Sequence, residues 1–401
     1  MHAELLVCVI HALTEGLLFQ RFLTPELVSD AALNAAFAAL AGERTSTQGA
    51  FASRAFGVHR GHRLAARGAG MTQNRRGLII GLGVGAAIVG ATAQAEPIKA
   101  ASGGRLRNVS VTTIRTAAGD GLGVRTPRGV LDVAGAEKDL RLGMPATVTA
   151  LIAGRGNVAA LAGLLANGAA KAPGHRLIGE DKLKFGRILD NPPKIICVGL
   201  NYAAHAAEGG SKPPSEPILF NKYTTAVNHH QGTINVTGEP GREWDYEAEL
   251  VVVMGKGGRN IPEASALDHV FGYASGNDFT ARDLQRKSAQ WMLGKTVDGS
   301  GPFGPWLVSA DQIDVNNLDM KMTVNGRLRQ STNTRLMIFS CAQIIAYCSK
   351  HFTMEAGDVI FTGTCEGTIS GDPPDKRVWL KAGDRMVTSI EKLGDLSVTL
   401  V

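Results

Sequence analysis

The sequence has few of the features that mark a disulfide-bonded or nucleic-acid-binding protein. It has five irregularly spaced cysteines and no CxxC pair: Cys8, Cys197, Cys341, Cys348 and Cys365. We therefore expect free thiols, with Cys197 in the protein core, and no disulfide framework. The net charge is only +6, and the basic residues are scattered and are not interleaved with aromatic side chains. This pattern argues against nucleic acid as a partner.

Long hydrophobic runs are also scarce. The apolar stretch at 78–89 is short and rich in Gly and Ala, so we expect no stable membrane span in the mature chain. It follows Arg75 and Arg76 and precedes an A-x-A sequence at 93–95, which is the order of an export signal and its cleavage site. The paired arginines resemble a twin-arginine signal. We predict a signal peptide at 71–95 and a periplasmic protein, with a cytoplasmic location as the alternative.

An export signal normally begins a protein, yet residues 1–70 precede this one. We interpret them as a non-native extension or an incorrectly assigned start, with Met71 as the true start. Behind the signal, short alternating runs at 104–135 predict a small antiparallel sheet, and the periodicity at 146–170 predicts helices. We therefore assign residues 96–190 to a small N-terminal domain.

Residues 191–401 have the pattern of a second, mainly β domain. Short strand-like runs alternate there with Gly and Pro turns, and one helix is expected at 341–351. The sequence thus predicts an α+β protein in which β-structure predominates. We expect the second domain to be the catalytic one.

Two glutamates interrupt the apolar strand pattern of EWDYEAELVVV, residues 243–253. Side chains two apart in a strand point to one face, so Glu247 and Glu249 repel each other unless a cation lies near them. Asp278 follows another strand-like run, and three carboxylates from neighbouring strands make an oxygen-rich site that suits Mg²⁺, Mn²⁺ or Ca²⁺. The lack of nearby Cys or His candidates argues against Zn²⁺. In the alternative interpretation, the glutamates face solvent on an edge strand.

A histidine and a glutamate lie three residues apart in NYAAHAAEGG. We expect Asn201 to cap a short helix and Gly209 and Gly210 to end it, which places His205 and Glu208 on one face. A carboxylate beside an imidazole raises its basicity, and such a pair can take a proton from water. The alternative is an ordinary His-Glu pair on the surface.

Two further segments contain candidate polar groups. Lys295 is expected at the end of a strand near the carboxylates, where its charge can stabilise a developing oxyanion. In FTGTCEGT, residues 361–368, the Thr364 hydroxyl and the backbone amides can hold a substrate carboxylate. The alternatives are a surface lysine and an ordinary turn that ends a strand.

Five motifs occur in a fixed order over residues 194–368: N-Y-x-x-H-x-x-E, D-Y-E-x-E-L, N-D-x-T-A-R-D-x-Q, G-K-x-x-D-x-x-x-P-x-G-P and G-D-V-I-x-T-G-T. Together they resemble the fumarylacetoacetate hydrolase family, and the resemblance extends over about 104–401. It implies a catalytic domain folded as a mixed β-roll, a small N-terminal α/β domain, a homodimer, and a bound divalent metal, Mg²⁺ or Mn²⁺ or else Ca²⁺.

The resemblance also assigns roles to the residues that match the family's motifs. The implied site residues are Glu247, Glu249 and Asp278 for the metal, His205 and Glu208 for water activation, Lys295 for the substrate oxygen, and Arg282, Gln285 and Thr364 for substrate binding. Cys365 stands where the family usually has a proline, directly after the threonine. This departure leaves the substrate preference at that end of the site open.

The activity implied by the resemblance is metal-dependent hydrolysis of a C–C bond in an acylpyruvate or another 1,3-diketo acid. The same scaffold also supports decarboxylases, lyases and isomerases of 2-oxo acids. From a different class, a non-catalytic periplasmic protein that binds dicarboxylates is a further alternative. The expected partner is in each case a small-molecule acid that chelates a metal through two oxygens.

Overall fold

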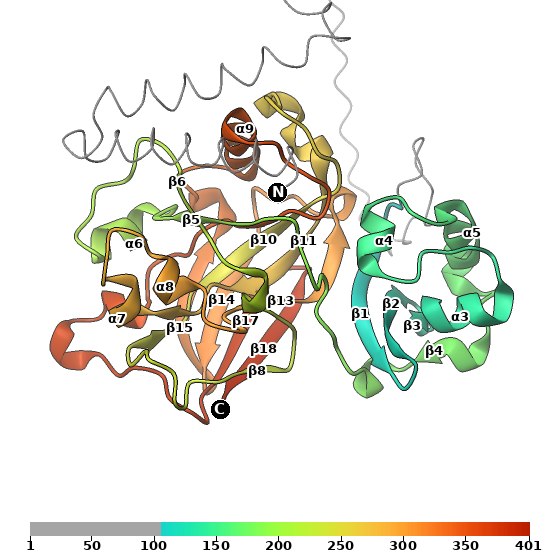
Figure 1. Ribbon diagram of the computed structural model, residues 1–401, viewed down its shortest axis with the longest axis horizontal. Helices are drawn as coiled ribbons and strands as arrows, with labels where there is room; N and C mark the ends of the chain where they lie inside the picture. The colour runs from blue at the N-terminus through green and yellow to red at the C-terminus, as the bar shows by residue number, and fades with distance from the viewer. Residues whose placement is uncertain (1–105) are drawn as a thin grey trace, which may run out of the picture. The chain divides into compact units, whose positions relative to one another are not determined.

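The structure is a computed structural model that describes residues 106–401. The predicted extension at 1–70 and the predicted signal peptide at 71–95 lie outside the described residues. Most of the regular structure in the described part is β, in two large sheets and a two-stranded one, which confirms the α+β, mainly β class (Figure 1). No helix within 106–401 has the length and the apolar character needed to cross a membrane.

The described chain begins with an antiparallel sheet that is followed by helices. β1 (Ser110–Thr116), β2 (Gly119–Thr126) and β3 (Gly129–Asp132) pair in sequence order. The helices that follow are α3 (Val133–Leu140), α4 (Val148–Ile152) and α5 (Val158–Ala169). Apolar side chains from the strands and from the helices share one buried core. Antiparallel strands are therefore present within the predicted range 104–135, at 110–132, and helices are present within 146–170, but the last part of the third predicted run belongs to α3.

These strands continue into a sheet that runs through much of the described chain. Its order is β4-β3-β2-β1-β13-β11-β10-β16-β5-β6, with β7 beside β13. The remaining members are β4 (Leu177–Ile178), β5 (Ile195–Gly199), β6 (Ile218–Asn221), β7 (Val227–Asn228), β10 (Ala248–Met254), β11 (Val270–Asn277), β13 (Gly301–Ser309) and β16 (Val359–Phe361). β1 pairs with β13 through Val111 and Leu307, so segments on both sides of residue 190 belong to this sheet. The sheet is mixed, because β16 is parallel to β5 and antiparallel to β10.

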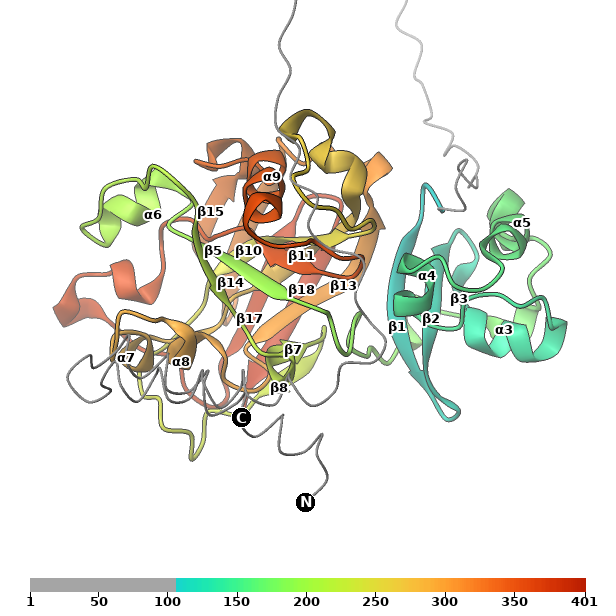
Figure 2. The same cartoon turned by 45° about the horizontal axis from the view of Figure 1, so that its top comes forward.

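A second sheet packs against the first (Figures 1 and 2). Its strands, in spatial order, are β15 (Arg327–Asn333), β14 (Asp319–Val324), β17 (Arg385–Ile390), β18 (Gly394–Leu400) and β8 (Gly232–Ile234). Leu250 and Val252 of β10 share a core with side chains of this second sheet, whereas Val251 and Val253 belong to the core of the N-terminal helices. Both faces of β10 are therefore buried, which explains its continuous apolar run.

The helix predicted at 341–351 is present and follows β15 in the chain. α9 (Cys341–His351) begins with a capping box in which Ser340 and Gln343 bond each other's backbone amides. The helix packs on the 3₁₀ segment η5 (Glu263–His269). The cysteines within the described residues, Cys197, Cys341, Cys348 and Cys365, are buried free thiols, as expected, whereas Cys8 lies outside the described part.

The prediction of one continuous strand at 243–253 is wrong, because the structure has two strands there, β9 (Trp244–Asp245) and β10. β9 pairs with β12 (Thr280–Ala281), whereas β10 starts only at Ala248 and pairs with β11. Between them, the Glu247 amide donates to the side chain of Asn277 and not to a ladder carbonyl. The interruption arises because the two halves have different partners, and it occurs at the first of the two glutamates.

Candidate metal centre and active site

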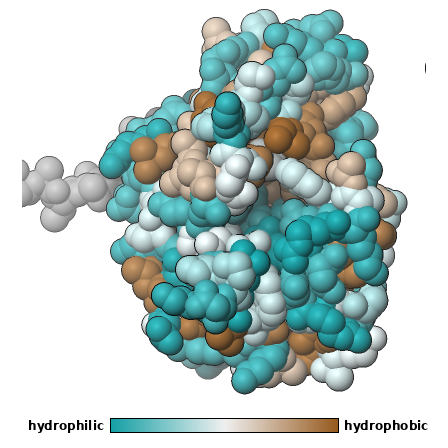
Figure 3. All heavy atoms as spheres, turned by 90° about the vertical axis from the view of Figure 1, so that its left-hand side faces the viewer, coloured by the Kyte–Doolittle hydropathy of each residue, from teal (hydrophilic) through white to brown (hydrophobic). Residues whose placement is uncertain are grey.

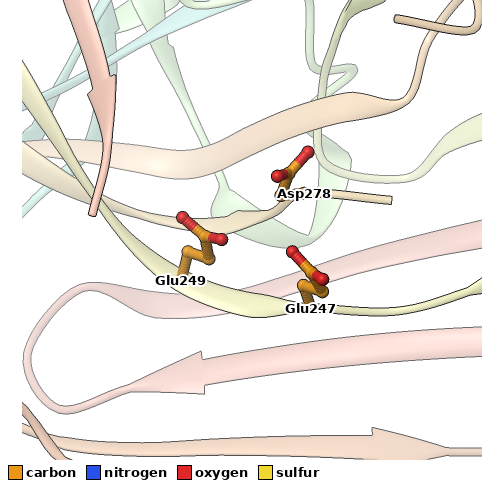
Figure 4. A group of neighbouring side chains, drawn as sticks. All are labelled: Glu247, Glu249 and Asp278. Carbon is orange, nitrogen blue, oxygen red and sulfur yellow. The ribbon is translucent and has the colours of Figure 1, made fainter. Parts of the chain in front are cut away.

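Three carboxylates meet where β10 begins and β11 ends. Glu249 lies on β10, Glu247 directly precedes this strand, and Asp278 directly follows β11. Figure 4 shows the two glutamates on one ribbon with their carboxylates turned toward Asp278 on its neighbour. One oxygen from each group lies within 4.8 Å of the others, and all three residues are buried. The alternative of solvent-facing glutamates on an edge strand is therefore wrong.

Buried cations surround two of these carboxylates. Lys295 Nζ lies 2.6 Å from Glu247 Oε2 and 2.8 Å from Asp278 Oδ2. Lys222 Nζ lies 2.6 Å from Asp278 Oδ1. Lys295 is buried at the C-terminal end of α8 (Met292–Lys295), so both the predicted strand end and the surface alternative are wrong. The predicted position of the Lys295 ammonium group beside the carboxylates is nevertheless confirmed, although a helix and not a strand carries it.

The two glutamates have opposite pKa shifts. For Glu247, burial opposes ionisation, but Lys295 and Arg282 outweigh it and lower the pKa to about 2. For Glu249, burial raises the pKa well above its usual value, and the charges of Asp278 and Glu247 raise it further. Its carboxylate accepts a hydrogen bond of 2.7 Å from the Gly363 amide. Glu249 is thus the carboxylate with the least charge compensation.

The composition of this cluster fits a divalent cation. Among the described residues, the buried carboxyl groups of Asp245, Glu247, Glu249 and Asp278 face the cations of Lys222, Arg282 and Lys295, so four carboxylates have only three cations when Glu249 is ionised. Asp278 Oδ1 is buried and has an ion pair with Lys222 but no aligned hydrogen bond. The ligands are all oxygens, which hard ions such as Mg²⁺, Mn²⁺ and Ca²⁺ prefer. The chain therefore has a site for a divalent metal ion.

His205 and Glu208 form the predicted pair on α6 (Ala203–Glu208). Glu208 Oε1 lies 2.8 Å from His205 Nδ1, which leaves Nε2 as the ring nitrogen that can accept a proton. The Gly367 amide and the Thr368 hydroxyl donate to Glu208. A Cβ at Gly371 would come within 2.3 Å of Glu208 Cδ, so this turn can carry no side chain here. The 367–368 turn therefore fixes the Glu208 carboxylate, and this carboxylate in turn orients the imidazole of His205.

The cap predicted for α6 is wrong. Tyr202, not Asn201, occupies the cap position, and its side chain makes no capping bond. The Asn201 side chain is buried and bonds the backbone of Phe339 and Thr362. The predicted end of the helix is confirmed, because Gly209 follows the last helical residue and Gly210 has a φ of 71°. Asn201 thus fixes the start of the α6 segment through distant parts of the chain.

A cavity of about 190 Å³ brings the predicted residues together. Its lining includes all of them except Asp278: His205, Glu208, Glu247, Glu249, Arg282, Gln285, Lys295 and Thr364. Phe220 and Trp291 form an aromatic wall, with their rings edge to face at 5.5 Å between centroids. The face of the molecule that carries α6 and α7 (Arg282–Gln285) is largely hydrophilic, with separate hydrophobic patches (Figure 3).

The predicted substrate-binding residues have partners within the protein. Arg282 pairs with Asp245 and Glu247 and donates to Gln285 Oε1. The Thr364 hydroxyl donates to the Ala248 carbonyl and accepts a hydrogen bond from Gln330. These bonds hold the side chains of the lining in place. A substrate that contacts Arg282, Gln285 or Thr364 must therefore either add to these bonds or replace them.

Three buried polar residues beside the site were not singled out from the sequence. Asp245 accepts from Arg282 and from the amides of Ile369 and Ser370, and it could have been found within D-Y-E-x-E-L. Gln330 bonds both Ala248 and Thr364. Lys222 follows a strand-like run, and no motif in the sequence distinguishes it. Gln330 and Lys222 reach the site only through contacts between distant segments of the chain.

The chain is similar to known proteins in both sequence and fold. Residues 194–401 match the model of the fumarylacetoacetate (FAA) hydrolase C-terminal family. The mitochondrial oxaloacetate tautomerase fahd2 of Xenopus laevis is 44% identical over 217 residues, 53% of this chain and 67% of that protein. A putative hydrolase of Burkholderia cenocepacia is 39% identical over 269 residues, 67% of this chain and 92% of that protein. The solved fumarylacetoacetate hydrolase of Exiguobacterium antarcticum has a TM-score of 0.61 and 32% identity, over 73% of this chain and 99% of that one.

Proposed function

Because this chain belongs to the fumarylacetoacetate hydrolase family, we propose that it is a metal-dependent hydrolase of acylpyruvates or other 1,3-diketo acids. One observation carries the proposal: the His205–Glu208 pair lines the same cavity as Glu247 and Glu249, two of the three carboxylates of the triad. The reaction breaks the C–C bond that joins the distal carbonyl carbon to the carbon between the two carbonyl groups. The distal carbonyl carbon takes the hydroxyl of water, and the other carbon takes the proton. The products are a carboxylic acid and a 2-oxo acid.

The residues of the cavity have complementary roles in this proposal. A divalent ion held by Glu247, Glu249 and Asp278 would supply positive charge for the oxygens of an enolate. His205 takes a proton from water through Nε2, and Glu208 stabilises the resulting imidazolium. Lys295 donates to Glu247 and Asp278, and from this position its ammonium group stabilises negative charge on a substrate oxygen. Phe220 and Trp291 supply an apolar side of the cavity against which a substrate can pack.

A second candidate is an isomerase of a 2-oxo acid, such as an oxaloacetate tautomerase. The 44% identity to a protein of that name favours it. Tautomerisation also passes through an enolate, but it moves a proton between carbon and oxygen and consumes no water. His205 would then carry that proton, and the cavity would not need to hold a nucleophilic water. Decarboxylation and lyase chemistry remain within the same class of enolate reactions.

The proposal is tested with the Mn²⁺-loaded full chain and His205→Ala. We expect wild type to release pyruvate from an acylpyruvate, measured by coupled reduction of pyruvate, and the variant to lose about 10²–10⁴-fold in rate. Its Mn²⁺-dependent rise in melting temperature should persist, because His205 is not among the three carboxylates. His351→Ala, at an exposed position of α9, is the matched control and should keep full activity.

The substrates separate the candidates. Acceleration of the enol-to-keto conversion of oxaloacetate, followed by its ultraviolet absorbance, without acylpyruvate cleavage would replace the hydrolase with the tautomerase. Full acylpyruvate cleavage by His205→Ala would contradict the water-activating role of the dyad. Mn²⁺ and oxalate binding without turnover of any tested acid would support a binding protein.

A further inference from the structure

Lys222 is a buried cation at the metal centre that neither the motifs nor the proposed reaction uses. It directly follows β6, and its side chain is fully enclosed. A buried ammonium group is costly unless charges and hydrogen bonds compensate it. Its surroundings therefore indicate what it does.

The ammonium group of Lys222 has more acceptors than it has protons. Nζ lies 2.6 Å from Asp278 Oδ1, 3.3 Å from the Phe279 carbonyl oxygen and 3.2 Å from that of Ser300. It also donates to the Ser300 hydroxyl and to the Lys295 carbonyl oxygen. An ammonium group offers three protons, so every one of them is engaged. Lys222 therefore cannot turn toward a ligand in the cavity.

The acceptors of Lys222 belong to the segments that form the metal centre. Asp278 is a carboxylate of the triad, and Phe279 is its neighbour in the chain. The carbonyl of Lys295 ends α8, whose side chain reaches Glu247 and Asp278. The Ser300 hydroxyl donates to this same carbonyl, so one ammonium group ties together the backbone that carries Asp278 and the backbone that carries Lys295.

The two lysines of the site differ in this respect. The Lys295 ammonium group is held by two carboxylates and lines the cavity, whereas Lys222 bonds mainly to backbone and does not line it. A cation or substrate that enters can replace Lys295 at the carboxylates. It cannot replace Lys222 without breaking the loop structure around residues 278–300.

We propose that Lys222 is a positioning residue of the metal centre: it orients Asp278 for the ion and fixes the end of α8 from which Lys295 extends. The proposal rests on the metal site of the proposed function. Groups that orient a ligand through a hydrogen bond or an ion pair typically change metal affinity by about 10–100-fold when they are removed. The same range is expected here.

The test compares Lys222→Met with Lys194→Met in the full chain. Lys194 also pairs with a buried aspartate, at 3.2 Å from Asp358, but it touches no carboxylate of the triad. Both variants lose a lysine–aspartate pair and should lose stability in EDTA. Titration calorimetry with Mn²⁺ alone, at a temperature where circular dichroism shows a folded chain, should give about 10–100-fold weaker binding for Lys222→Met only.

Equal Mn²⁺ affinity of folded Lys222→Met and wild type would overturn the proposal. Tighter binding would also overturn it, because Lys222 would then act only as a repelling charge. If Lys222→Met does not fold, Lys222→Gln keeps a hydrogen-bond donor at this position and removes the charge that pairs with Asp278 Oδ1. About tenfold weaker Mn²⁺ binding is then expected, and unchanged binding would overturn the proposal.

Wild type serves to separate this inference from the proposed function. If wild type binds Mn²⁺ but cleaves no acylpyruvate, the reaction is wrong while the role of Lys222 is still decided by the variants. If wild type binds no Mn²⁺, the metal site is wrong, and the positioning role falls with it.

Discussion

Glu247 and Glu249 are two residues apart, yet their surroundings are opposite. Glu247 pairs with Lys295 and Arg282, and its pKa falls to about 2. Glu249 accepts a hydrogen bond from the Gly363 amide, and its pKa rises well above the usual value because of burial and the charges of Asp278 and Glu247. One glutamate is thus compensated by the protein itself, whereas the other is not.

This difference separates the stability of the fold from the binding of the ion. On the Glu247 side, cations already in the chain stabilise the buried carboxylates before any metal arrives. On the Glu249 side, ionisation of the buried carboxyl group is disfavoured in the metal-free protein, and a cation that binds there would compensate the charge. The following variants distinguish the two sides.

The largest effect on the metal-free protein is expected from Glu247→Gln. The substitution removes a charge that both Lys295 and Arg282 use, so it leaves buried cations short of a partner. We expect a loss of about 3–5 kcal/mol in the free energy of unfolding, measured by urea denaturation in EDTA. Wild-type stability for this variant would remove the distinction between the two glutamates.

Glu249→Gln should have the reverse pattern. In EDTA its stability should equal or exceed that of wild type, because a neutral amide replaces a carboxyl group that is costly to ionise at this position. The stabilisation by Mn²⁺, about 2.7 kcal/mol at a hundredfold excess over Kd in wild type, should largely disappear. The measurement is the melting temperature with EDTA and with Mn²⁺. A full Mn²⁺ response would show that Glu249 is not needed for the ion.

A smaller effect is expected from pH in the metal-free protein. The pKa of Glu249 is raised in the folded state, so its contribution to stability is complete below the unfolded value of 4.5 and is lost as pH rises through the folded pKa. The stability of Glu249→Gln relative to wild type should therefore increase above this pH, by about 1.4 kcal/mol per pH unit at most. Urea denaturation in EDTA at several pH values measures the difference. Parallel pH profiles for the two proteins would contradict the raised pKa.

The parts of the site that the sequence predicted depend on local geometry. Glu247 and Glu249 share a side because the backbone there is extended, even though the strand is interrupted between β9 and β10. His205 and Glu208 meet because they are three apart on a helix. Such relations are contained in short stretches of sequence and survive errors in the exact element boundaries.

The parts that the sequence did not reveal depend on distant segments. Lys222 becomes part of the site through its ion pair with Asp278 and through hydrogen bonds to residues that lie 57 to 78 positions later. Asn201 has the residue type of a helix cap, but partners 138 and 161 positions away use its side chain instead. Tertiary contacts therefore override local preference at both positions, and no periodicity in the sequence records them.

The wall of the cavity has a practical consequence. The Trp291 indole packs against Gly199 so closely that a Cβ there would come within 2.3 Å of its ring. Of the four tryptophans in the sequence, it is the one that lines this cavity. Its indole is therefore the intrinsic fluorophore placed to respond when an ion or an acid enters the cavity, and comparison with Trp291→Phe would isolate its signal from that of the other tryptophans.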